Sequence, residues 1–140
     1  MTPTHRSSPW WTWLLPGVAL AVGVLGAIAA WLAVFMVTKW PAPWFALLAA
    51  ADMALMLRLG GAPAGHARAW LAVLGTAVAI AGAAWMIAAT QMTAFFALSP
   101  LESAQRLGPV LAGELLRHAT DGWGRALVLL SLPLAWRLAR

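Results

Sequence analysis

The 140-residue chain has no cysteine and very little charge. Without thiols, the chain cannot form disulfides, zinc–thiolate sites or iron–sulfur clusters, and thiol redox chemistry is excluded. Asp, Glu, Lys and Arg together make up 9% of the residues, whereas soluble domains carry about 25%. Hydrophobic residues reach 63%, so the composition indicates that water is not the main solvent of this protein.

Two long stretches, 7–38 and 69–101, contain no Lys, Arg, Asp or Glu. A helix crosses the hydrocarbon core of a bilayer with about 20 mainly apolar residues, so each stretch predicts a membrane span. The first stretch is too long for a secretory signal, because its apolar run 14–37 covers 24 residues and the apolar part of a signal covers about 7–15.

We expect one all-α membrane domain over residues 1–140, built as a bundle of four transmembrane helices. The second and fourth helices are short. In the fourth segment only eleven residues between Arg125 and Arg137 are uncharged, so it spans only if both arginines extend to the interfaces. Tryptophans at the ends of the first segment mark the headgroup boundaries. The predicted spans are about 13–37, 44–59, 69–91 and 123–139.

An extramembrane loop is predicted at 92–122. Within it, Ser99-Pro100-Leu101-Glu102 forms a capping box with proline at the first helical position. Leucines then recur on one side of the helical wheel, which predicts an amphipathic helix lying at the membrane surface between the third and fourth spans. This pattern fits a lid over the bundle and a partner-docking surface equally well.

The basic residues lie beside apolar segments, so the formal charge of +5 favours anionic lipid headgroups over nucleic acid as the counter-charge. Eight of the nine basic residues are Arg, which together with abundant Ala, Gly and Trp indicates a GC-rich bacterial genome. We therefore expect a multi-pass protein of the bacterial inner membrane. Five basic residues on one side against four on the other favour an orientation with both termini in the cytoplasm.

Small residues recur at helical spacing in three segments, and such residues let transmembrane helices approach closely. We expect helix contacts within the chain through Ala46, Ala50, Ala54, Gly75, Ala79, Ala83, Gly23 and Gly26.

Asp52 is the candidate functional residue, because it lies near the centre of the second segment. An ionised carboxylate at mid-bilayer costs about 2.5–3.5 kcal/mol, so it normally has a partner, a proton or a water-filled cavity. Thr76 and Gln91 on the third segment are the possible polar partners. Asp52 is therefore either a packing residue bonded to them or a proton carrier.

No catalytic, cofactor-binding or metal-binding residues are expected. The three histidines, His5, His66 and His118, all fall outside the predicted spans, so no pair can ligate a haem inside the bilayer. The acidic residues of the loop have no spacing that fits a nucleophile with a base and an orienting group.

Two functions remain open from sequence. The first is a non-enzymatic accessory or assembly subunit, whose short spans are completed by a larger membrane protein. The second is a small proton-coupled transporter that acts as a homodimer through Asp52. In size and span number the chain resembles the small multidrug transporters, whose essential carboxylate is a Glu in the first span. The first segment here carries no acid, so no residue is transferred from that resemblance.

Overall fold

The structure is a computed structural model that describes residues 10–96, 102, 105, 108–110, 113–114, 117 and 121–140, with the backbone alone for 94–96. Over these residues it is all-helical, as the sequence predicts. Most of the predicted capping box and of the predicted amphipathic helix lies outside the described residues, as do His5 and His118. The elements are η1 (Trp10–Trp13), α1 (Leu14–Thr38), α2 (Phe45–Leu59), α3 (His66–Phe96) and α6 (Gly122–Ala139).

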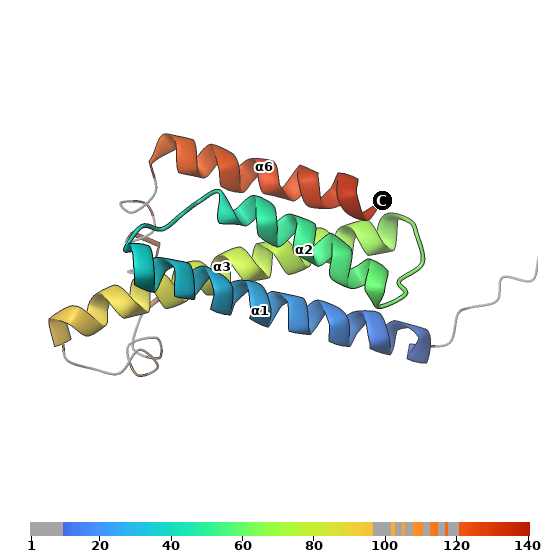
Figure 1. The fold of residues 1–140 in the computed structure, drawn as a ribbon, viewed down its shortest axis with the longest axis horizontal. Coiled ribbons are helices and arrows are strands. Elements are labelled where there is room, and N and C mark those ends of the chain that lie inside the picture. The colour runs from blue at the N-terminus through green and yellow to red at the C-terminus, as the bar shows by residue number, and fades with distance from the viewer. Residues whose placement is uncertain are drawn as a thin grey trace, which may run out of the picture.

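The four α-helices run side by side and alternate in direction along the chain (Figure 1). α2 and α3 each pack against the other three helices, whereas the described parts of α1 and α6 do not contact each other. The shortest helix, α2, is thus central to the bundle. α2 and α3 together therefore hold the bundle, because each contacts all of the other helices.

The helices lie where the apolar segments are predicted, with α3 as the main difference. It begins at His66 and continues to Phe96, so the first residues of the predicted loop are helical, because the sequence has no proline or glycine from Thr90 to Leu98 to end the helix. Two helical stretches are long and apolar enough to cross a membrane, namely Trp10–Thr38 and His66–Thr93.

Small residues form the inner faces of the helices. Ala46, Ala50, Ala79 and Ala83 are all completely buried, which confirms their predicted place at helix contacts. Larger side chains at these positions would push the helices apart, so alanine sets the close spacing of the bundle.

The glycines differ in their packing. A Cβ atom on Gly23 would lie 2.8 Å from Met56 Cγ, and one on Gly75 would lie 2.7 Å from Leu20 Cδ1, so both glycines admit side chains of neighbouring helices. The prediction for Gly26 is wrong, because it is exposed and has open space around its Cβ direction. It lies among the exposed residues of α1, outside the face that contacts α2 and α3.

Two arginines donate hydrogen bonds to the backbone carbonyls at the C-terminal end of α6. Arg58 of α2 donates from Nη2 to the Leu138 carbonyl at 2.5 Å, and Arg68 of α3 donates from Nε to the Ala139 carbonyl at 2.5 Å. The last carbonyls of a helix have no partner within it and carry the negative end of its dipole. The two guanidinium groups satisfy both needs and tie α6 to α2 and α3.

Large apolar side chains cover the outside of all four helices. On α1 alone, Leu15 is 67% exposed and Leu25 is 68% exposed. Exposed apolar surface of this kind marks a region that contacts a membrane or another protein. Other outward residues are Val18, Val22, Leu48, Leu55, Leu74, Val78, Leu129 and Leu130.

We expect Gly60→Ala to destabilise the bundle. Gly60 has an ordinary helical φ of −70°, but an added Cβ would lie 2.8 Å from the Pro16 Cα atom, which is backbone and cannot turn aside. Overpacking of this kind costs about 1–3 kcal/mol. The thermal unfolding midpoint of the detergent-purified protein should fall for Gly60→Ala. It should stay the same or rise for Gly26→Ala, which adds the same methyl group in open space within a helix. Equal midpoints for the two variants would contradict the close contact of α1 with the end of α2.

Candidate functional site

The predicted polar cluster around Asp52 is not joined by hydrogen bonds. Thr76 is fully buried, and its hydroxyl donates to the Ala72 carbonyl of its own helix at 2.8 Å. Gln91 is half-buried, four turns further along α3. Within the described part of the chain, no hydrogen bond or ion pair connects Asp52 to another side chain.

Asp52 is half-buried at the middle of α2 and lies at the edge of its outward surface. One turn away on one side are the exposed Leu48 and Leu55, and one turn away on the other are Ala49 and Met56. Residues three and four apart share a helix face. The carboxyl group therefore lies at the boundary between the α1–α2 contact and the apolar exterior, where a group from outside the chain can reach it.

A second site begins at the connection between α1 and α2, which folds back along α1. Lys39 ends α1 in a left-handed conformation (φ 56°), and Ala42 adopts a second one (φ 44°). The Trp31 indole Nε1–H, about two turns before the end of α1, donates to the Pro41 carbonyl at 2.7 Å. The chain thus returns to the level of Trp31 before α2 begins, and the Trp31 and Phe45 rings pack with centroids 5.4 Å apart.

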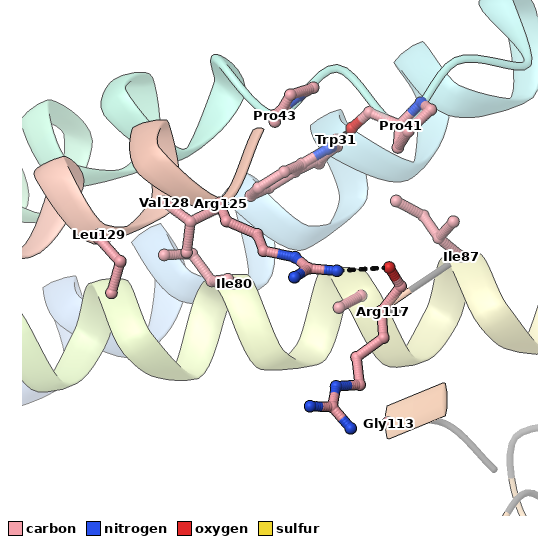
Figure 2. Close-up of a pocket in the computed structure, with 11 residues that line it drawn as sticks. Trp31, Pro41, Pro43, Ile80, Ile87, Gly113, Arg117, Arg125, Val128 and Leu129 are labelled. Carbon is pink, nitrogen blue, oxygen red and sulfur yellow. Dashed lines mark hydrogen bonds between the residues drawn. The ribbon is translucent and has the colours of Figure 1, made fainter. Parts of the chain in front are cut away.

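A cavity of about 370 Å³ opens beside this connection (Figure 2). It lies between α1, α3 and α6, and its walls are almost entirely apolar. The volume is within the range of about 300–1,000 Å³ that is usual for small-molecule sites. The lining residues are Trp31, Pro41, Pro43, Ile80, Ala84, Ile87, Gly113, Arg117, Arg125, Val128 and Leu129.

Arg125 supplies the charge at this cavity. It lies in the first turn of α6, and its Nη2 donates to the Arg117 carbonyl at 2.7 Å (Figure 2). Asp121 caps the same helix by accepting a hydrogen bond from Gly124 N at 2.9 Å. Arg125 forms no ion pair with a described carboxylate, so the other N–H groups of its guanidinium remain available to a ligand.

Sequence reasoning missed this cavity because its walls come from three helices that are distant in the chain. One signal was available. Trp31 lies inside the first predicted span, away from the interface clusters of tryptophan, and an indole N–H in apolar surroundings needs an acceptor. The pairing of that N–H with a loop carbonyl is what brings the two prolines to the cavity wall.

No protein-family model, curated protein or solved structure matches the chain. Its class therefore comes from the fold: an all-helical protein with two helices suited to crossing a membrane. Among the residues that the structure describes, no group of three or more His, Cys, Asp or Glu side chains is placed to hold a metal ion.

We expect Trp31→Phe to weaken the α1–α2 connection. The substitution keeps an aromatic ring near Phe45 but leaves the half-buried Pro41 carbonyl without its donor, and the loss of a typical hydrogen bond costs about 0.5–1.5 kcal/mol. The thermal unfolding midpoint of the detergent-purified protein should fall for Trp31→Phe. In the control Trp44→Phe, the ring being replaced is 42% exposed, and the midpoint should change little. A Trp31→Phe protein as stable as the control would show that the indole hydrogen bond does not hold this connection.

Proposed function

We propose that the protein is a multi-pass integral membrane protein in which all four helices cross the bilayer, and that it acts as a non-enzymatic accessory or assembly subunit of a larger membrane complex. The apolar exterior of all four helices supports the membrane location. The position of Asp52 supports the assembly role.

The geometry of the short helices is compatible with four crossings. The 15 residues of α2 span about 22 Å of a hydrocarbon core about 30 Å thick. The connection 39–44 covers the part of the hydrocarbon core that α2 does not span, because this connection runs alongside α1 to the level of Trp31. The 18 residues of α6 span about 27 Å, and Arg125 and Arg137 stand near its two ends.

The charges divide between the two ends of the bundle in the way that the sequence predicts for four spans. Arg58 and Arg68 meet the C-terminal end of α6, and Arg117 and Arg125 lie at the opposite end beside Pro41. Arg137 and Arg140 lie beside the first pair and Lys39 lies at the opposite end. Four described basic residues thus stand against three, and this excess favours the end of Arg58 and Arg68 as the cytoplasmic one. We therefore propose a bacterial inner-membrane protein with both termini in the cytoplasm.

Asp52 is the observation that carries the proposed function. In the middle of a transmembrane helix, a carboxyl group without a partner in its own chain is costly, and the described hydrogen bonds give it none. Its place beside Leu48 and Leu55 makes it reachable from a neighbouring transmembrane helix. Asp52 also does not line the described cavity. These observations favour a polar contact with a partner subunit over proton transport through the chain.

Replacing the carboxyl group should release the partner. When the protein is extracted from its native membrane in a mild detergent, we expect wild type to migrate in a complex larger than two copies of the chain, and Asp52→Leu to migrate as the free protein. Asp52→Asn keeps hydrogen-bonding capacity and should retain part of the complex. The measurement is native mass determination of the extracted particles.

The matched control is Leu55→Ala, which alters the same outward surface of α2 without touching the carboxyl group and should leave the complex intact. Wild type recovered as a single, monodisperse copy would contradict the assembly role. A particle of two copies, together with the loss of proton-driven substrate uptake when Asp52→Asn is reconstituted into vesicles, would establish the transporter instead.

A further inference from the structure

We infer that the cavity beside Trp31 is a binding site for an anionic phospholipid, which places one acyl chain between α1, α3 and α6 and its phosphate at Arg125. The inference rests on the proposed membrane location but is independent of the partner at Asp52. It assigns a ligand to a site that the proposed function leaves unused.

The walls of the cavity select an acyl chain. Ile80, Ile87 and Val128 present aliphatic side chains, and Ala84 leaves space between the two isoleucines. The one indole N–H in the wall already donates to the Pro41 carbonyl at 2.7 Å. A polar ligand would lose its hydrogen bonds to water and gain none from these walls, so the buried part of the ligand must be apolar.

The mouth of the cavity selects a negative charge. Arg117 is already paired with Glu114, with 3.7 Å between Nη1 and Oε1, and its guanidinium points away from Arg125 (Figure 2). Arg125 has a carbonyl as its described partner, so its positive charge is not neutralised by a carboxylate there. A phosphate accepts the remaining guanidinium N–H bonds, and such charge-assisted bonds are among the strong ones.

The surrounding leaflet is the source of the ligand. Arg125 lies in the first turn of α6, at the end of the bundle where Trp123 is 74% exposed. This is the depth of lipid phosphates, while the apolar walls of the cavity extend from it toward the middle of the bundle. A phospholipid of that leaflet combines both chemistries at the right depth.

The test uses the full chain in nanodiscs made from equal amounts of phosphatidylglycerol and phosphatidylcholine. After release into detergent, native mass spectrometry counts the lipids retained on each protein molecule. Wild type should retain one lipid, mainly phosphatidylglycerol. Arg125→Gln should lose about tenfold in its preference for phosphatidylglycerol, as expected for the loss of one charge-assisted contact. Ala84→Phe, which fills the cavity, should retain neither phosphatidylglycerol nor phosphatidylcholine.

Arg137→Gln removes an arginine at the other end of α6 and should retain phosphatidylglycerol as wild type does. The inference is overturned if Arg125→Gln and Arg137→Gln show the same preference, or if Ala84→Phe keeps its lipid while its unfolding midpoint matches wild type. Should Ala84→Phe fail to fold, the comparison of the two arginine variants decides alone. A wild-type protein that does not incorporate into nanodiscs would instead contradict the proposed membrane location.

Discussion

The structure depends on one constraint: in apolar surroundings each backbone polar group must find its partner within the chain. Helices satisfy this internally, so the constraint acts at their ends. At one end of the bundle, the Trp31 indole satisfies the Pro41 carbonyl, and the two prolines of the connection bring no N–H of their own. At the other end, Arg58 and Arg68 satisfy the last carbonyls of α6. The short helices α2 and α6 are held at these points.

The packing of α2 bears on where its acidic residue lies. Its buried face consists of alanines with Met53 and Leu57, so α1, α3 and α6 can all approach it and little room is left inside the bundle for a polar group. Asp52 is consequently placed at the edge of the helix rather than in the interior. The rotation of α2 that buries its alanines thus leaves its one acidic residue half-buried beside the exposed Leu48 and Leu55, where the proposed partner would bind.

The sequence predicted the helices well because their signals are local. Runs of uncharged residues, prolines at 41 and 43 and glycines at 60 and 61 fix where each helix begins and ends. It also identified most of the small residues at the helix contacts. What it could not provide was the rotation of each helix about its axis, which is set by packing against several neighbours. For that reason Gly26 was misplaced, and the cavity formed by Ile80, Val128 and the two prolines was not foreseen.

The most direct test of the account is whether α2 crosses the membrane. The chain lacks cysteine, so single cysteines can be introduced without a background. Trp40→Cys and Ala64→Cys place thiols on exposed residues before and after α2. With a membrane-impermeant maleimide applied to intact cells and to inside-out vesicles, we predict that the two thiols are labelled from opposite sides. Labelling of both from the same side would contradict a four-span bundle.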